Sequence, residues 1–537
     1  MAANALWYGD NLDVLRERIA PESVDLIYLD PPFNSNRSYN VLFGRKHGDD
    51  ARAQIVAFDD TWTWAPETEQ LYIEMLSGGA PARVADALQA MHGLLGEGEV
   101  MAYLVMMAAR LVELHRVLKP TGSIYLHCDP TASHYLKVLM DAIFDVRNYR
   151  SEITWRRTNT HGDSKKWANV ADTILYYGKT QTVIWNPAHE AYSEEYLASK
   201  YRHDDHDGRG AYQLDNMTSP NPRPNLTYEW MGHAPPAYGW RYDRTTMQRL
   251  HDEGRIWYPS DKSKRPRLKR YLGEMSGPVM GNVWTNIPPI NSQAAERLGY
   301  PTQKPQALLE RIIAASSNEG DVVLDPFCGC GTTIAAAQAL DRRWIGIDVT
   351  FIAIDLVRRR LEDAYGEKLD YELHGIPRDL GGAKALFLES PFDFERWAVS
   401  MVNGQPNEKQ VGDKGIDGVI RFPLDAKTSV GRCIVSVKGG GQINPAMVRD
   451  LGGTITNHKA EMGVLITMDR ATPGMIDAAN HGGSYTWPIN EATFPRVQLI
   501  TVAQLLKGEQ PSLPPVLTPY LKAPRHAAKA DQLKMDG

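Results

Sequence analysis

The sequence has few cysteines, no long apolar segment and no excess of charge of one sign. Four cysteines among 537 residues favour a reducing compartment and argue against a disulfide framework. No apolar run is long enough to span a bilayer, and residues 1–7 lack the basic region and apolar core of a signal peptide. These absences predict a cytoplasmic protein. The formal net charge of -6 neither supports nor excludes nucleic-acid binding, because the charges that contact nucleic acid are local.

Two common kinds of ligand site are missing as well. Cys328 and Cys330 are separated by one residue, which is too few for the usual zinc pair, and no histidine cluster completes a set. The glycines around them do not match the three-glycine dinucleotide fingerprint, and no Gly-Lys-Ser/Thr follows. The sequence therefore disfavours a zinc site and a phosphate cradle in this stretch.

The chain is too long for one core, and its composition divides it into segments. Strand and helix patterns alternate in the first and third segments, which predicts a parallel sheet covered by helices on both faces. After two predicted strands, the second segment loses its periodicity and becomes rich in proline, glycine, asparagine and aromatic residues. A linker, a further α/β segment and a tail follow. The predicted bounds are 1–150, 151–300, 301–366, 367–388, 389–508 and 509–537.

The first segment contains the sequence Asp30-Pro31-Pro32-Phe33 directly after the apolar run 24–29. Proline has no N–H for a sheet ladder, so the predicted strand must end here. Ligands of open parallel sheets collect beyond the carboxyl ends of the strands. The tetrapeptide alone is compatible with an ordinary turn or with a functional site.

The third segment predicts a ligand loop between two strands. The strand 321–325 ends in Asp325, the loop 326–331 contains two glycines, and a helix follows. The next strand, 344–348, ends in Asp348, which suits a ribose diol. Because phosphate cradling is disfavoured, an adenosine ligand that is positively charged or lacks phosphate fits this pattern better.

A basic run lies inside the aromatic-rich second segment. Six cations occur within nine residues, namely Lys262, Lys264, Arg265, Arg267, Lys269 and Arg270. Such a run is often only a solvated face. Its position in an insert between two α/β segments also allows contact with the phosphates of a nucleic acid.

These motifs, taken together, resemble the DNA amino-methyltransferases of the circularly permuted beta class. Residues 30–33 match the catalytic motif of that family, whereas 302–305 and 325–333 match its cofactor region in the family's order. The resemblance covers about 6–365. It implies a Rossmann-like sheet with an inserted target-recognition region and the cofactor S-adenosyl-L-methionine.

The resemblance also implies roles for individual residues. The Asp30 carboxylate and the Pro31 carbonyl would accept hydrogen bonds from an exocyclic amine, so that the nitrogen lone pair points at the methyl group. Pro32 completes the motif, and Phe33 would stack on a base rotated out of the duplex. Residues implied in cofactor binding are Asp10, Lys304, Asp325, Phe327, Gly329, Gly331, Thr332 and Asp348. His127 is either a pocket residue or a histidine satisfied within the fold.

The identity of the base follows from one position. In this family, Asp before Pro-Pro is typical of N6-adenine enzymes and Ser is typical of N4-cytosine enzymes, so Asp30 favours adenine. C5-cytosine methylation needs a cysteine nucleophile, and no Pro-Cys dipeptide occurs in the chain.

The fifth segment resembles the Mrr-type restriction endonuclease-like domains of the PD-(D/E)XK fold. Glu395, Asp417 and Lys438 stand at matching positions. In active members of that fold, an Asp and a Glu or Gln two residues before the Lys bind a divalent ion, such as Mg²⁺, that activates water. Ser436 occupies that last position here. Two alternatives remain: a degenerate DNA-binding or interaction module, and a working nuclease.

The resemblance implies double-stranded DNA as the partner, in a prokaryotic cytoplasm where the protein is nucleoid-associated. A homodimer or a restriction-system partner is a further expectation. The main hypothesis is an adenine-N6 DNA methyltransferase, and the alternatives are a bifunctional restriction–modification protein, an N4-cytosine methyltransferase and a catalytically silent DNA-binding scaffold.

Overall fold

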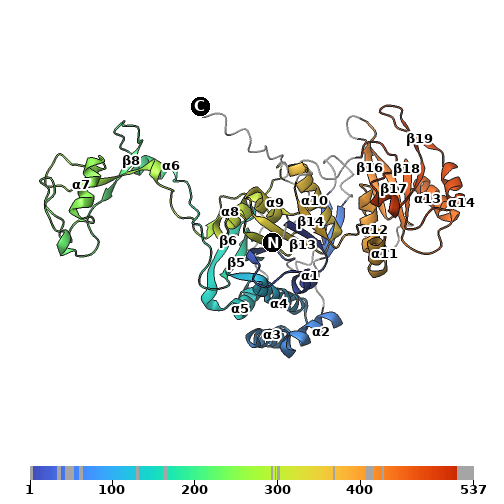
Figure 1. Ribbon diagram of the computed structural model, residues 1–537, viewed down its shortest axis with the longest axis horizontal. Helices are drawn as coiled ribbons and strands as arrows, with labels where there is room; N and C mark the ends of the chain where they lie inside the picture. Colours follow the sequence, from blue (N-terminus) through green and yellow to red (C-terminus); the bar gives the residue numbers. More distant parts are fainter. Residues whose placement is uncertain are drawn as a thin grey trace. The chain divides into compact units, whose positions relative to one another are not determined.

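The computed structural model describes residues 4–32, 38–42, 54–59, 64–128, 132–160, 167–291, 294, 296, 298, 303–366, 369–406, 415–425 and 429–516. The chain divides into two compact units (Figure 1). The first is formed by Met1–Asn186 together with Asn282–Gly537, and the second is formed by Pro187–Gly281.

A nine-stranded sheet organises the first unit. β7 runs antiparallel to both of its neighbours, and the other neighbouring strands are parallel. The sheet predicted from the first and third segments is therefore parallel, and the antiparallel strand comes from the second segment. In spatial order the strands are β11 (Val283–Trp284), β6 (Tyr149–Arg156), β7 (Ala171–Gly178), β5 (Leu118–Cys128), β2 (Val24–Leu29), β12 (Val322–Asp325), β13 (Arg343–Asp348), β1 (Asn4–Tyr8) and β14 (Tyr371–His374).

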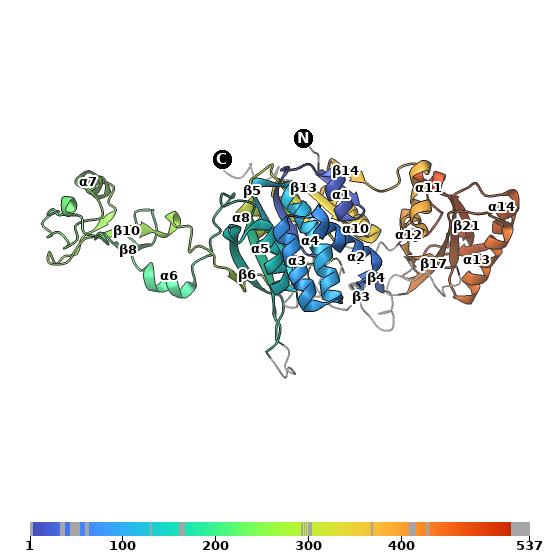
Figure 2. The ribbon, with the colours of Figure 1, turned by 90° about the horizontal axis from the view of Figure 1, so that it is seen from below.

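Helices cover both faces of this sheet, as the alternating pattern predicts. On one side lie α8 (Gln306–Ser316), α9 (Thr332–Ala339) and α10 (Phe351–Tyr365), and on the other lie α1 (Asn11–Arg18), α4 (Glu99–Val117) and α5 (Ser133–Phe144) (Figure 1). Every residue of β2 is buried, because both faces of this central strand are covered. Figure 2 shows α3 (Ala82–Leu95), α4 and α5 side by side across one face. The helices on both faces therefore hold the ends of the strands in fixed positions.

The predicted segment boundaries differ from the structure at two places. β6 and β7 lie within the predicted insert 151–300 but belong to the large sheet, so the separate unit is the shorter Pro187–Gly281. The predicted linker 367–388 contains β14, which pairs with β1, and most of α11 (Leu380–Glu389). The linker was predicted because 367–388 contains three glycines among polar residues. β6 and β7 were predicted as strands, but the aromatic-rich and proline-rich sequence that follows them placed them in the insert.

The second unit is small and has its own core. Its three strands are β8 (Tyr212–Asn216), β10 (Arg267–Tyr271) and β9 (Ile256–Trp257), and its helices include α6 (Glu194–Lys200) and α7 (Arg244–Asp252). Met247 and Leu250 of α7 pack into a cluster that contains several large aromatic residues. The buried members of this cluster are Met217, Trp230, Trp240, Met247, Leu250, Ile256 and Leu268.

The C-terminal part of the first unit contains a second sheet with five strands. In spatial order these are β15 (Gln405–Pro406), β16 (Gly418–Pro423), β17 (Val430–Lys438), β18 (Met462–Thr467) and β21 (Val497–Thr501). Its helices are α11, α12 (Pro391–Met401), α13 (Pro445–Asn457), α14 (Pro473–Asn480) and α15 (Val502–Leu506).

Leu513 and Val516 of the predicted tail pack against the core of this part, and 517–537 lie outside the described residues. The remaining elements are β3 (Ser38–Leu42), β4 (Gln54–Asp59), α2 (Pro66–Glu74), β19 (Ser484–Thr486), β20 (Thr493–Pro495) and four short helical turns, η1 to η4. Among the described helices, none is long and apolar enough to cross a membrane.

Candidate active site

Three carboxylates meet where three neighbouring strands end. Asp30 follows β2, Asp325 is the last residue of β12, and Asp348 is the last residue of β13. β2 pairs with β12, and β12 pairs with β13. Within this sheet, the next strand in the chain after β2, β5, lies on one side of the β2–β12 pair, and the next strand after β12, β13, lies on the other side. Open α/β sheets bind ligands at such a switch in strand order. The structure thus brings together residues that are almost 300 positions apart.

Asp30 has one engaged and one free carboxylate oxygen. Lys304 Nζ forms an ion pair with Asp30 Oδ2, and both side chains are largely buried, at 13% and 15% exposed. Asp30 Oδ1 is buried and has no hydrogen-bond partner among the described residues. A buried acceptor without a partner is unfavourable by about 1–3 kcal/mol. The geometry therefore leaves Oδ1 available to a donor that enters from outside.

A buried hydrogen-bond chain lies beside Asp30. The Tyr28 hydroxyl and His127 Nδ1 are 2.9 Å apart, and His127 Nε2 is 3.1 Å from Asp172 Oδ2. Burial, followed by the nearby charge of Asp30, raises the pKa of Tyr28 well above its usual range. Burial acts to raise the pKa of Asp172, but the hydrogen bond and the charge of His127, together with the charges of Lys304 and Arg157, outweigh it and the pKa is lowered. His127 is thus satisfied within the fold, the second of its two predicted roles.

Asp325 organises the loop between β12 and α9. Its carboxylate accepts the Phe327 N–H at 3.0 Å and the Thr333 hydroxyl at 2.5 Å. Burial raises the pKa of Asp325 to about 7, and the charges of Asp30 and Asp348 add to the shift. Both carboxylate oxygens of Asp325 are therefore occupied by hydrogen bonds that hold the loop in place.

Asp348 and a glycine shape the same loop. Asp348 accepts hydrogen bonds from the Gly329 N–H at 2.9 Å and from Thr350, and burial raises its pKa. Gly331 has a φ of 72°, and a Cβ there would lie 2.7 Å from Val357 Cγ2. Only glycine fits this position without strain or displacement.

A carboxylate–arginine pair next to β1 supports the loop between β12 and α9. Asp10 caps α1 by accepting the Leu12 N–H, and both of its oxygens lie 2.9 Å from Arg110 Nη2. Asn11, held by Arg110 Nε, donates to the Pro326 carbonyl at 2.7 Å. The side chain of Asp10 remains 45% exposed. Its observed contacts tie α1 and α4 to the ligand loop.

The C-terminal sheet gathers the four residues predicted as a nuclease remnant. Asp417 Oδ2 accepts the Val437 N–H at 2.6 Å and the Ser436 hydroxyl at 3.3 Å, and Lys438 Nζ lies 4.0 Å away. Burial, with the charge of Asp417, raises the pKa of Glu395 on α12 to about 7. Within the described part of the chain, no group of three or more His, Cys, Asp or Glu residues could hold a metal ion.

The sequence of this chain matches a known family. The family model for N6/N4 DNA methylases matches residues 24–357, which is more than half of the chain. The chain belongs to this family of DNA methyltransferases. S-adenosyl-L-methionine is accordingly its cofactor, and DNA is its substrate class.

Relatives of the methyltransferase support the assignment. The type II methyltransferase M.EcaI of Enterobacter cloacae is 30% identical over 369 residues, which cover 68% of this chain and 71% of M.EcaI. The Mod subunit of the type III restriction-modification enzyme StyLTI of Salmonella typhimurium is 26% identical over 68% of this chain, which spans only about half, 54%, of that subunit. The DNA adenine methyltransferase YhdJ of Escherichia coli K12 is 26% identical over 67% of this chain and 84% of YhdJ.

Solved structures and a second family model complete the comparison. M1.HpyAVI in complex with S-adenosylmethionine is 14% identical, covers 66% of this chain and 99% of its own, and has a TM-score of 0.30. The cytosine-N4-specific PvuII DNA methyltransferase is 13% identical, covers 69% and 95%, and has a TM-score of 0.30. Residues 392–507 match the model for NACHT-associated inactive restriction endonuclease 1. The methyltransferase thus carries a C-terminal restriction-endonuclease-like domain of an inactive type.

The structure fits the cofactor at the loop after β12. S-adenosylmethionine carries a positively charged sulfonium, and three carboxylates converge at this sheet edge with one lysine among them. The two buried acids have raised pKa values, so a bound cation favours their ionised forms. Exposed Val349, next to Asp348, adds an apolar surface that the sequence prediction missed.

Three further residues support the site, and the sequence patterns did not predict them. Arg110, Asn11 and Thr350 hold the predicted acids in place, yet they lie in ordinary helical or turn contexts. In the sequence, they differ from ordinary surface residues only in being polar at positions where the helix pattern predicts burial. Phe33, predicted to stack on the base, lies outside the described residues, as does Thr302. Pro31 is buried and Pro32 is half-buried after β2, where the motif predicts them.

The six cations of the predicted DNA-binding run separate into two groups. Lys262, Lys264, Arg265 and Arg267 are exposed on the second unit. Lys269 forms an ion pair with Asp205 at 2.5 Å, and Arg270 pairs with Asp215 at 2.8 Å. The last two cations are thus partly neutralised by acids of their own unit.

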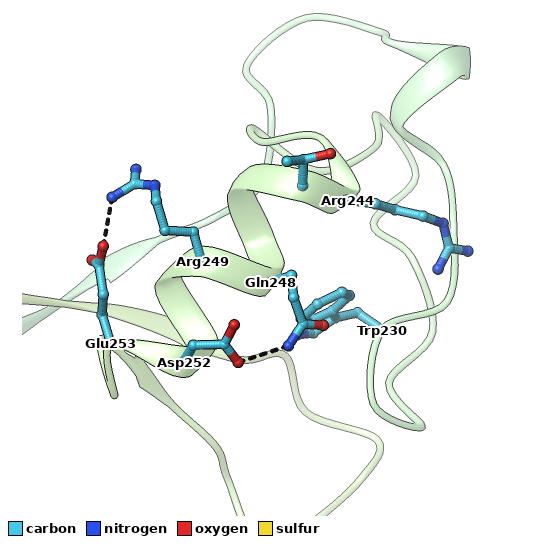
Figure 3. A pocket seen from close by; sticks show the side chains of 7 residues that line it. Trp230, Arg244, Gln248, Arg249, Asp252 and Glu253 are labelled. Carbon is cyan, nitrogen blue, oxygen red and sulfur yellow. Dashed lines mark hydrogen bonds and ion pairs between the residues drawn. The ribbon is translucent and has the colours of Figure 1, made fainter.

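Two pockets of the second unit lie beside α7. Figure 3 shows one of them, where Trp230 lies next to Gln248 and Arg244 reaches past it. Gln248 donates to Asp252 at 2.8 Å, and Arg249 pairs with Glu253 at 2.9 Å. The other pocket contains five cationic side chains, namely Arg209, Arg249, Arg255, Lys269 and Arg270.

Proposed function

We propose that this methyltransferase transfers a methyl group from S-adenosylmethionine to N6 of adenine at a specific sequence in duplex DNA. The observation that carries the proposal is the buried, unpartnered Oδ1 of Asp30, held by the ion pair of Oδ2 with Lys304. An exocyclic amine has N–H donors that such an oxygen can accept.

The chemistry follows from the poor nucleophilicity of an aromatic amine, whose lone pair is delocalised into the ring. A hydrogen bond to Asp30 Oδ1, with a second to the Pro31 carbonyl, holds the amine so that its lone pair is less delocalised into the ring and points at the methyl group. Positioning and preorganised electrostatics of this kind lower the barrier without a covalent intermediate. Lys304 keeps the carboxylate oriented, because it occupies the oxygen that the amine does not use.

The bound cofactor would supply an electrophilic methyl group on its sulfonium: the S–CH3 bond breaks as the N–CH3 bond forms, S-adenosylhomocysteine leaves as a neutral thioether, and the amine loses one proton to solvent. We assign its ribose hydroxyls to Asp348 and its methionine portion to Phe327, Gly329, Gly331 and Thr332. Asp325 and Asp10 support this loop through the contacts described above.

Adenine is proposed over cytosine because Asp30 stands before Pro31-Pro32, where the N4-cytosine enzymes of the family have Ser. Among the relatives, YhdJ is named as an adenine methyltransferase, whereas the PvuII enzyme is named as cytosine-N4-specific. The family model covers both chemistries.

The second unit is proposed to read the DNA sequence. Its exposed cations suit phosphate contacts, and the exposed face of α7 presents arginine and glutamine, which can read base edges in the major groove. The C-terminal domain is proposed to bind DNA or a restriction-system partner without cleavage, whether or not its origin is Mrr-type.

Transfer of tritiated methyl groups to mixed-sequence DNA tests the proposal, with the methylated nucleosides identified by mass spectrometry. The expected product is N6-methyldeoxyadenosine, and Asp30→Ala is expected to lower the rate on the order of a hundredfold or more. Asp477→Asn, on the exposed end of α14, is the matched acidic control. N4-methyldeoxycytidine as the product contradicts the adenine assignment, and no transfer at all favours a silent scaffold.

A further inference from the structure

A single tryptophan stands out among the exposed apolar side chains. Trp167 is 96% exposed, more than any other large hydrophobic side chain in the described part of the chain. Trp has the largest side chain and is usually buried over most of its surface. Covering an indole that lies almost entirely in water is favourable, and Trp is among the side chains that dominate the energetics of interfaces.

Trp167 lies on the hairpin that connects β6 and β7. The last backbone hydrogen bonds described in this hairpin join the Arg157 N–H, at 2.9 Å, and the Thr158 N–H, at 3.3 Å, to the Val170 carbonyl. Trp167 precedes Val170 by three residues, so it can lie up to about 10 Å farther from the sheet than those hydrogen bonds do. Figure 2 shows the hairpin extending away from the sheet.

The hairpin projects from the same sheet edge as Asp30. β2 is parallel to β5, and β7 is antiparallel to both β5 and β6, so β6 runs in the direction of β2. β7 lies two strands away from β2, a lateral distance of about 10 Å. Trp167 is thus carried past the strand tips on the side where the proposed substrate approaches.

The base of this hairpin is fixed. Arg157 forms an ion pair with Asp172 at 3.2 Å, and Asp172 continues the buried chain through His127 to Tyr28, two residues before Asp30. Trp155 is buried and donates from Nε1 to the Ile287 carbonyl at 3.1 Å. A rigid base beneath the exposed Trp167 side chain suits a side chain that must be placed accurately in another molecule.

The proposed reaction creates a need for such a side chain. The amine of adenine reaches Asp30 only after the base has left the duplex stack, which leaves a gap between its neighbours. Aromatic side chains stack on any base, and apolar wedges inserted at a base step stabilise an opened duplex. The exposed Arg156 at the root of the hairpin suits the flanking phosphates.

We propose that Trp167 enters the duplex and fills the space left by the target base. This inference rests on the proposed function, since a wedge is needed only if the base is extruded. It predicts that Trp167 matters for opening a paired site and matters little where the site is already open.

The test uses two duplexes that carry the target sequence found by methylation-sensitive sequencing. In one, the target adenine is paired with thymine, and in the other it lies opposite an abasic position. Single-turnover methyl transfer is measured for the wild type, Trp167→Ala and Trp167→Phe. Leu388→Ala, which alters an 81% exposed side chain on α11, is the control.

Trp167→Ala is expected to be roughly tenfold or more slower on the paired duplex, because stacking on a base is worth about that factor or more. On the abasic duplex it should approach the wild-type rate, and Trp167→Phe should keep most of the rate on both. Equal losses of rate on the two duplexes would overturn the wedge and indicate a general DNA contact. No loss of rate on either duplex would also overturn the wedge.

A separate measurement keeps the proposal testable if the wild type methylates neither duplex, which would count against the proposed function. Tryptophan fluorescence is then compared between the wild type and Trp167→Phe while paired duplex is added. Stacking of Trp167 between bases predicts a quenched component that the variant lacks, and identical quenching in both proteins would overturn the wedge.

Discussion

Lys304 and Asp30 are 274 positions apart in the chain and meet as a largely buried ion pair at the tip of β2. The sequence resemblance places Lys304 among the cofactor-binding candidates. Its contact with Asp30 gives it a different proposed role, in which it positions the carboxylate that receives the amine.

Substitution of Lys304 separates these two roles. Lys304→Met keeps most of the side-chain length and removes the charge, so Asp30 loses a charge-assisted hydrogen bond. We expect single-turnover methyl transfer to slow roughly ten- to a hundredfold. Calorimetric affinity for S-adenosylmethionine should change much less. A large loss of cofactor affinity with a normal single-turnover rate at saturation would return Lys304 to the cofactor site.

Asp325 predicts a specific dependence of stability on pH. Its pKa is raised from 3.8 to about 7 by burial, so between these values the folded protein binds a proton that the unfolded chain releases. The contribution of Asp325 to stability is therefore lost as pH rises through this window, and it is constant above it.

Asp325→Asn removes this contribution while keeping groups that can bond to Phe327 and Thr333. Relative to the wild type, the free energy of unfolding of the variant should increase between about pH 4 and pH 7. Urea unfolding at several pH values measures it, with Asp477→Asn as the matched substitution. A constant difference across the window would show that Asp325 is ionised throughout.

At the scale of elements, the junction between β12 and α9 is built around Gly331. Its φ of 72° begins α9, and Val357 of α10 packs against its Cα. The helix and the ligand loop can approach each other this closely only because no Cβ intervenes.

Gly331→Ala is expected to destabilise the protein through both strain and collision. Gly320, in the turn before β12, has a φ of 79° but nothing within 4 Å of an added Cβ, so Gly320→Ala reports strain alone. Gly331→Ala should be less stable than Gly320→Ala by about 1–3 kcal/mol. Thermal unfolding measures the difference, and Val357→Ala in the same chain should recover part of it. Equal stabilities would mean that α10 moves aside at no cost.

The whole molecule combines a methyltransferase sheet, a separate small unit and a restriction-endonuclease-like domain. The chain leaves the large sheet after β7, forms Pro187–Gly281 and returns at β11. The C-terminal domain keeps Asp417 and Lys438 near each other but has Ser436 where active nucleases have a metal-binding side chain.

This arrangement predicts a domain that does not cleave DNA. Supercoiled plasmid incubated with the full-length protein and Mg²⁺ should remain intact, because two carboxylates and a serine hydroxyl make a weak site for a hard cation. Ser436→Glu adds a carboxylate beside Asp417 and should bind Mg²⁺ more tightly by calorimetry than the wild type. Plasmid nicking by the wild type that Asp417→Asn abolishes would establish a working nuclease.

The sequence by itself determined the local features of this protein. The stop after β2 follows from two prolines, and the ligand loop follows from glycines between a strand and a helix. The acids at the ends of β12 and β13 follow from alternating α/β segments. These features depend on neighbours within a few residues, so their motifs are legible in the chain.

Only the tertiary structure decided which of these residues meet. The pairing of β2 with β12 places Asp30 beside the cofactor loop, and the ion pair with Lys304 leaves Oδ1 as the free acceptor. The roles of Arg110, His127 and the hairpin that carries Trp167 arise in the same way. Contacts between distant segments depend on sheet order and burial, and no local pattern of residues specifies either.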